Sequence, residues 1–149
     1  MKTLVVYDSV HGNTGSIAKA IGEAITGEVE VLPVGEVNTS QLTAFDLLIV
    51  GSPTYGGRPT EAMRDFLDKV RESGLKGTNV AAFDTRLTAR WVRIIGFAAG
   101  RIAGRLKKDG GTLVVSPEGF FVEGTEGPLK EGELERAAAW AKKIVESIE

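Results

Sequence analysis

Cysteine is absent from this chain of 149 residues, and histidine occurs only once, at His11. The absence of cysteine excludes disulfides, thiolate metal sites, iron–sulfur clusters and thiol nucleophiles. A single histidine argues against a zinc or haem site built from histidine side chains. The sequence therefore predicts no metal site.

Long apolar runs are also missing. The longest, around Trp91 to Gly100, is interrupted by Arg93 and is too short to span a membrane. The first residues lead directly into an apolar strand and do not show the pattern of a signal peptide. We expect a cytoplasmic protein with one domain over residues 1–149, which is long enough for a single core.

Apolar residues alternate between strand-like and helix-like spacing five times along the chain. Strands are predicted at residues 4–7, 28–34, 46–50, 80–83 and 113–115, and the last can resume at 120–122. Thr60 is a predicted helix cap, and a further short helix is predicted after Asn38. Alternating βα units predict an α/β fold with a five-stranded parallel sheet, doubly wound as a three-layer sandwich.

The final helix is predicted to begin at about Gly132. Its apolar residues recur at helical spacing, so one face should pack on the sheet. The residues assigned to that buried face are Leu134, Ala138, Ala141, Val145 and Ile148.

The first βα connection carries small hydrogen-bonding residues between a buried strand and a helix. Ser9, Asn13 and Thr14 supply donors, and Gly12 allows a positive φ or a close approach of a ligand. Unpaired amides and the positive end of the helix dipole point into such a loop. The loop is therefore a candidate anion site, or else an ordinary solvated turn.

The six residues Ser9-Val-His-Gly-Asn-Thr resemble the phosphate loop of flavodoxins, hydroxyl-x-Thr-Gly-x-Thr, except that His11 replaces a hydroxyl. A nucleoside-triphosphate P-loop does not match, because no Gly-Lys-Ser/Thr follows. The spacing of Gly12 and Gly15 also differs from a dinucleotide fingerprint. The resemblance implies FMN as cofactor and a flavodoxin-like sheet of strand order 2-1-3-4-5.

Two further loops follow the third and fourth predicted strands and should lie at the same edge of the sheet. Residues 51–56 resemble the flavodoxin loop Gly-x-x-Thr-aromatic-Gly, which implies that Tyr55 stacks on the flavin ring. Asp84, Thr85 and Arg86 are placed to meet the pyrimidine edge of the flavin. Trp91 could cover the ring, or equally could be a core or partner contact.

Seven basic residues and no acidic ones lie between Arg86 and Lys108, in a chain of net charge −2. Such a run is usually a solvated helix face. It could also dock an acidic partner, or contact a membrane surface peripherally through neighbouring apolar residues. Nucleic-acid binding is disfavoured, because no reading element accompanies the charge.

The sequence thus predicts an FMN-binding, flavodoxin-like electron carrier that passes electrons between a reductase and an acceptor. These redox partners are expected to carry an acidic docking face. The alternative is an FMN-dependent NAD(P)H:quinone oxidoreductase on the same fold. A receiver-type signalling domain is disfavoured, since the third strand ends in Val50-Gly51-Ser52 without a phosphoacceptor aspartate. No catalytic residue is predicted. The predicted cofactor-binding residues are Ser9, Val10, His11, Gly12, Asn13 and Thr14, then Ser52, Pro53, Thr54, Tyr55, Gly56 and Gly57, and finally Asp84, Thr85, Arg86 and Trp91.

Overall fold

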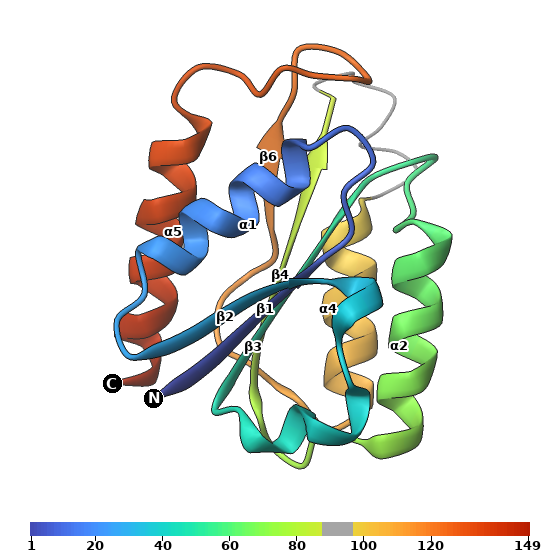
Figure 1. The fold of residues 1–149 in the computed structure, drawn as a ribbon, viewed down its shortest axis with the longest axis vertical. Helices are drawn as coiled ribbons and strands as arrows, with labels where there is room; N and C mark the ends of the chain where they lie inside the picture. The colour runs from blue at the N-terminus through green and yellow to red at the C-terminus, as the bar shows by residue number, and fades with distance from the viewer. Residues whose placement is uncertain (88–96) are drawn as a thin grey trace.

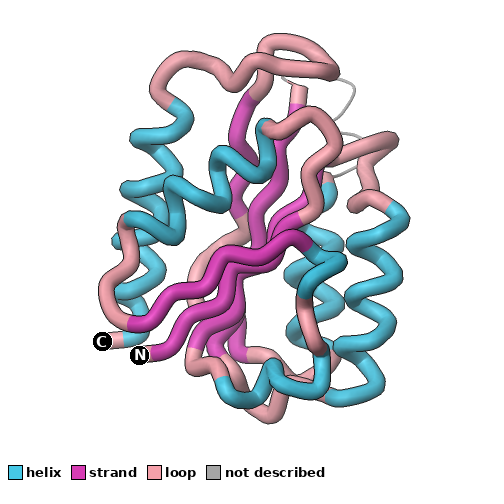
Figure 2. The backbone as a smooth tube through the Cα atoms, viewed as in Figure 1, coloured by secondary structure: helices cyan, strands magenta, loops and turns pink. Residues whose placement is uncertain are grey.

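A central sheet with helices on both sides forms the molecule in the computed structural model, which describes residues 1–87 and 97–149 (Figure 1). Figure 2 shows the same arrangement, with the strands as the middle layer. Along the chain, the elements are β1 (Lys2–Tyr7), α1 (Asn13–Glu23), β2 (Glu28–Pro33), the 3-10 turns η1 (Val34–Glu36) and η2 (Thr39–Ala44), β3 (Leu47–Pro53), α2 (Glu61–Ser73), β4 (Asn79–Arg86), α4 (Ala98–Lys108), β5 (Thr112–Leu113), β6 (Glu118–Phe121) and α5 (Glu133–Ile148).

The sheet is parallel and has the order β2-β1-β3-β4-β5, which confirms the predicted fold and strand order. The fifth predicted strand is divided into two short strands that both pair with β4. β5 pairs with Asn79 and Val80 at the start of β4, whereas β6 pairs with residues 83–86 at its end. The interruption falls around Pro117, whose missing N–H cannot join a ladder of hydrogen bonds.

Apolar residues fill both sides of the sheet. Successive residues of a strand point to opposite faces, so Leu4 and Val6 of β1 pack against the core beneath α2 and α4. Val5 packs instead against α1 and α5, where it meets Ile17 and Ile21. Helices α2 and α4 therefore cover one face and α1 and α5 the other, as the doubly wound prediction requires (Figure 1).

Two of the predicted helix caps are present. The hydroxyl of Thr60 accepts a hydrogen bond from the amide of Met63 (3.2 Å) and begins α2. The side chain of Asn38 accepts from the amide of Ser40 (3.1 Å) and begins η2. Both contacts satisfy amides that lack a partner within the helix.

The buried face of α5 differs from the prediction. Ala141 is buried as expected, but Leu134 is 46% exposed and Ala138, Val145 and Ile148 are only partly buried. The residues that face the sheet are instead Ala137, Trp140, Ala141 and Ile144.

An aromatic cluster explains this rotation of α5. Trp140 packs edge to face against Phe83 of β4 and Phe120 of β6, with ring centroids 6.1 and 6.0 Å apart. Burial of a large aromatic ring contributes more than burial of Leu134 or Ala138, and edge-to-face geometry adds to it. Apolar spacing alone did not show which of the two overlapping stripes on α5 is buried, because it does not take side-chain size into account.

No helix within the two described stretches of the chain has both the length and the apolar character of a membrane span.

Glu133 joins the start of α5 to β6. Its carboxylate is nearly buried and accepts from the amide of Phe121 (2.7 Å) and from the guanidinium of Arg136 (2.6 and 2.9 Å). The hydrogen bond from Arg136 is the main cause that lowers the pKa of Glu133 below its ordinary value of 4.5, against the opposing effect of burial. Arg136 also lies over the ring of Phe120, so the ion pair rests on the aromatic cluster.

We expect Glu133→Gln to lower the free energy of unfolding at pH 7 by about 1–3 kcal/mol, because a charged acceptor of three hydrogen bonds is replaced by a neutral amide. A lowered pKa in the folded state stabilises the fold above pH 4.5, and this contribution is lost as the pH falls through the lower folded value. The difference in free energy of unfolding between wild type and variant should therefore become smaller below about pH 4.5. Urea unfolding at pH 7 and at pH 3 measures this difference. Glu135→Gln, an exposed change in the same turn, is the control, and an equal loss in both variants would contradict the assignment.

Candidate functional site

A pocket lies at the carboxyl edge of the sheet, where the loops after β1, β3, β4 and β6 converge. The parallel register places Tyr7, Gly51 and Phe83 side by side near this edge, so the following residues share one region of space. In α/β sheets such an edge is the usual ligand site. The pocket is lined by Val10, His11, Asn13, Thr14, Pro53, Thr54, Tyr55, Gly56, Gly57, Thr85, Arg86, Leu87, Val122 and Thr125.

One end of the pocket is polar and suits an anion. Gly12 is the N-cap residue of helix α1, has a φ of 90° and carries no side chain that could cap the first turn. The hydroxyls of Thr14 and Thr85 are 2.9 Å apart and buried at the pocket wall. Ser9 accepts from the amide of Gly15 (3.2 Å) and thereby fixes the loop. The positive end of the helix dipole and the amides of its first turn therefore face the pocket.

The other end of the pocket carries a tight turn with an aromatic ring. Tyr55 and Arg58 exchange two backbone hydrogen bonds of 2.9 and 3.0 Å, and Gly56 and Gly57 between them have φ values of 56° and 77°. These positive φ values favour glycine at both positions. Arg101 of α4 donates from Nε to the carbonyl oxygen of Gly57 (2.8 Å) and holds the turn from behind.

The ring of Tyr55 stands at the rim of the pocket and is 39% exposed. Partial burial is the main cause that raises the pKa of Tyr55 above 10.0, and the negative charge of Asp8 adds to it. Asp8 itself accepts a hydrogen bond from the hydroxyl of Thr60 (2.6 Å). Tyr55 therefore stays a neutral phenol at physiological pH, and its flat apolar face is available for a ring.

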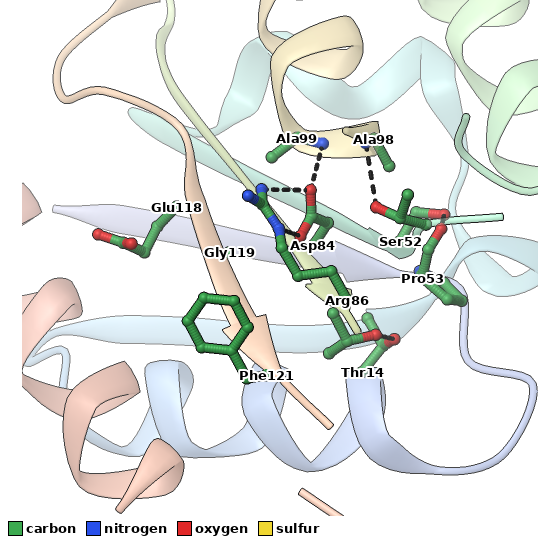
Figure 3. Close-up of polar contacts among 12 residues, drawn as sticks. Thr14, Ser52, Pro53, Asp84, Arg86, Ala98, Ala99, Glu118, Gly119 and Phe121 are labelled. Atoms are coloured by element: carbon green, nitrogen blue, oxygen red, sulfur yellow. Dashed lines mark hydrogen bonds and ion pairs between the residues drawn. The ribbon is translucent and has the colours of Figure 1, made fainter. Parts of the chain in front are cut away.

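Beneath the pocket, Asp84 forms a buried ion pair with Arg86. Two hydrogen bonds of 2.7 and 2.8 Å join the guanidinium to the carboxylate, and the amide of Ala99 donates to the same carboxylate (2.9 Å), as Figure 3 shows. Arg86 also stacks on Phe97, 3.4 Å from the ring centroid. A Cβ on Gly119 would lie 2.1 Å from Nε of Arg86, so only glycine leaves room for this side chain.

The structure brings most of the predicted cofactor-binding residues together and places four of them outside the pocket lining. Ser52 is fully buried, where its hydroxyl donates to the carbonyl of Pro53 and accepts from the amide of Thr60. Asp84 is fully buried as well and faces α4 and not the pocket. Ser9 and Gly12 shape the loop without lining the pocket. Trp91 lies outside the described residues.

Three lining residues were missed by reasoning from the sequence: Leu87, Val122 and Thr125. The signal that could have found two of them was present, because a strand at 120–122 was expected. Its carboxyl end must lie at the same edge as those of β1, β3 and β4. Val122 and Thr125 come directly after β6, so the rule that selected the first three loops would also have selected them.

In the part of the chain that the structure describes, no group of three or more histidine, aspartate or glutamate side chains is arranged to hold a metal ion. No carboxylate occurs among the described residues that line the pocket.

Comparison with known proteins places the chain in a family. Residues 4–93, more than half of the chain, match the family model of the flavodoxin domain. The chain belongs to the flavodoxin family. Members of this family bind FMN.

Relatives in the flavodoxin family are similar over part or all of the chain. The flavodoxin of Maridesulfovibrio salexigens is 33% identical over 89 residues, which are 55% of this chain and 61% of that protein. A probable flavodoxin of Bacillus subtilis is 31% identical over 87 residues, 55% of this chain and 54% of that protein. The chain thus spans about half the length of these curated relatives. The crystal structure of oxidised flavodoxin 2 from Bacillus cereus has a TM-score of 0.85 and 29% identity, covering 98% of this chain and 99% of that one.

The residues present fit the flavin mononucleotide of this family. FMN carries a phosphate at one end and a flat ring system at the other. The pocket lining combines the start of helix α1 and the hydroxyl of Thr14 with the partly exposed ring of Tyr55. It also includes apolar side chains such as Val10, Pro53 and Val122.

A double-mutant cycle tests the buried ion pair. We expect Asp84→Asn to lower the free energy of unfolding by about 2–4 kcal/mol. Breaking a fully buried ion pair costs about 3–5 kcal/mol. The expected loss is somewhat smaller here, because the side chain of Arg86 is 16% exposed. The cycle itself uses Asp84→Leu, Arg86→Met and the variant that carries both substitutions. The double variant should lose less free energy of unfolding than Asp84→Leu alone, because it leaves no unpaired charge. Urea unfolding provides the measurement, and a double loss equal to the sum of the two single losses would contradict the pairing.

Proposed function

We propose that this chain holds FMN in the pocket at the carboxyl edge of the sheet and carries electrons between a reductase and an acceptor protein. The observation that carries the proposal is that one pocket is lined both by the start of α1, which suits an anion, and by the aromatic ring of Tyr55. Membership of the flavodoxin family supports the choice of cofactor. A cytoplasmic location is part of the same proposal.

The chain's own residues would divide the work of binding. Amides of the first turn of α1 and the hydroxyl of Thr14 would hold the phosphate, with His11 beside them. Tyr55 would stack on the ring, and the turn through Gly56 and Gly57 would border its edge. When bound, FMN would supply the reversible uptake and release of electrons.

Arg86 would bring a positive charge to the pocket wall, but not an unpaired one. Its two hydrogen bonds to Asp84 offset most of the charge locally. The pair would therefore stabilise added negative charge at the ring less than an isolated arginine would. The Asp84 carboxylate would act through Arg86 and not by touching the cofactor.

A carrier is favoured over a stand-alone enzyme because the chain matches the flavodoxin domain and its relatives are named flavodoxins. Among the described lining residues, the titratable side chains are His11, Tyr55 and Arg86. Charge-steered encounters with partner proteins fit this simple site. We propose partners with an acidic docking face, since α4 carries Arg101, Arg105, Lys107 and Lys108 and no acidic residue.

Replacing the aromatic ring tests the cofactor site. We expect Tyr55→Ala to weaken FMN binding to the apoprotein by about 1–3 kcal/mol, the scale of losing one aromatic face and its buried area. Tyr55→Phe keeps the ring and is the matched control, with affinity close to wild type. Titration of apoprotein with FMN, followed by flavin fluorescence, gives both values. If the alanine variant kept wild-type affinity and quenching, the stacking role would belong to another residue.

Reduction kinetics separate the carrier from the quinone oxidoreductase. We expect NADPH alone to reduce the FMN-loaded protein slowly and without saturation, because a carrier receives electrons from a partner protein. Stopped-flow mixing with NADPH, monitored at the flavin absorption band, measures this rate, and dithionite provides the positive control for reducibility. Fast and saturable bleaching without an added reductase would contradict the carrier function and favour the enzyme.

A further inference from the structure

A groove runs between α2 and α4 on the face of the sheet opposite α1 and α5. The pocket at the carboxyl edge is separate from it, although the turn at Gly57 and Arg58 borders both. The groove is lined by Arg58, Pro59, Arg64, Leu67, Arg101, Gly104, Arg105 and Lys108.

The charge of this groove is of one sign. Among the described residues that line it, five of eight are cationic and none is acidic, with Arg58 and Arg64 on the α2 side and the others on α4. At the rim, Asp68 pairs with Arg105 (2.5 Å) and offsets part of this charge. The summed potential along the groove is therefore positive and attracts anionic groups.

The groove between α1 and α5 provides an internal comparison. Among the residues that line it, Lys19 and Lys142 are balanced by Glu23 and Glu135. Both grooves lie between two helices that cover one face of the sheet, yet only the one beside α4 has an excess of positive charge. The packing of two helices on a sheet therefore does not by itself explain the excess of positive charge in the groove between α2 and α4.

Two glycines leave the backbone of α4 open beside the groove. Gly100 and Gly104 are exposed, and a Cβ on either would meet nothing within 4 Å. Packing on the sheet, a natural expectation for a glycine repeat, does not explain them. Glycine inside a helix is also less favourable than alanine, so its presence needs another reason. Glycine at these positions would permit close approach by a second chain.

The groove is connected to the pocket through one turn. Arg101 lines the groove and donates to the carbonyl oxygen of Gly57, which lines the pocket. Arg58, at the end of the groove, shares the backbone hydrogen bonds of Tyr55. A chain bound in the groove would therefore lie directly behind the turn that carries the aromatic ring.

We propose that the groove between α2 and α4 docks an acidic helical segment of a partner protein. Carboxylates on the segment pair with Arg58, Arg64 and Lys108, while small apolar side chains between them reach the exposed backbone at Gly104. This inference rests on the proposed function, because it gives the electron-transfer partner a place to bind. The cations stand on both sides of a hollow, which suits an inserted segment better than a flat lipid surface.

Arg86 takes no part in this docking surface. Its guanidinium is committed to Asp84 and to the ring of Phe97, and its side chain is only 16% exposed. Its reversal would break the fold of the pocket and would not report on docking. Arg64 and Lys108 are exposed and lie outside the cofactor pocket, so they can be changed without touching it.

The test uses isotope-labelled protein loaded with FMN and a synthetic helical peptide of about fourteen residues, rich in glutamate with a few leucines on one face. Nuclear magnetic resonance should show saturable shifts centred on Arg58, Arg64, Gly104 and Lys108. The double variant Arg64→Glu with Lys108→Glu should weaken peptide binding about tenfold or more at low salt. The control, Lys19→Glu with Lys142→Glu, changes the net charge by the same amount and should weaken it less than about threefold.

Each other outcome counts against the proposal. Equal weakening of peptide binding in both double variants would show that net charge alone attracts the peptide. Resonance shifts spread over the whole surface would lead to the same conclusion. Binding to anionic lipid vesicles in place of the peptide would make the groove a membrane contact. Flavin absorbance distinguishes a failure of the proposed function, because protein that takes up no FMN can still be mapped with the peptide. If the reversed variant fails to fold, Arg64→Gln with Lys108→Gln replaces it, with an expected loss of about threefold or more.

Discussion

The carboxylate of Asp84 is the constraint on which the candidate site depends. It is fully buried, and a buried charge must be paired and hydrogen-bonded to be tolerated. Arg86 supplies two hydrogen bonds and the amide of Ala99 a third, at the positive end of α4. One side chain thus fixes β4, the start of α4 and the orientation of the arginine at the pocket wall. Gly119 on β6 is part of the same arrangement, because a larger residue would displace Arg86.

This pairing divides the positive charge of the molecule into two parts with different consequences. Arg86 is neutralised at the cofactor pocket, whereas the cations on α4 and the start of α2 remain on the surface. The basic run in the sequence looked uniform and gave no indication of this division. A positive groove beside a weakly charged pocket fits a carrier that attracts its partner without strongly biasing the charge of its cofactor.

The sequence predicted the architecture and the loops well, because alternating apolar segments and glycine-bearing turns are local signals. The parallel order and the position of Tyr55 at the common edge followed from them. Contacts between distant residues could not be predicted in this way. Ser52 and Asp84 have side chains typical of a binding site, yet their partners are Thr60, Arg86 and the start of α4. The prediction for the buried face of α5 was wrong for the same reason, because that face is set by contacts with aromatic rings from β4 and β6.

The central claim is that one pocket, built by the loops after β1, β3, β4 and β6, holds FMN. Titration of isotope-labelled apoprotein with FMN, followed by nuclear magnetic resonance, tests it most directly. The account predicts saturation at one FMN per chain, with the largest shifts at Thr14, Gly57, Thr85 and Thr125 and none in the groove between α1 and α5. Absence of saturable binding, or shifts centred away from these residues, would contradict it.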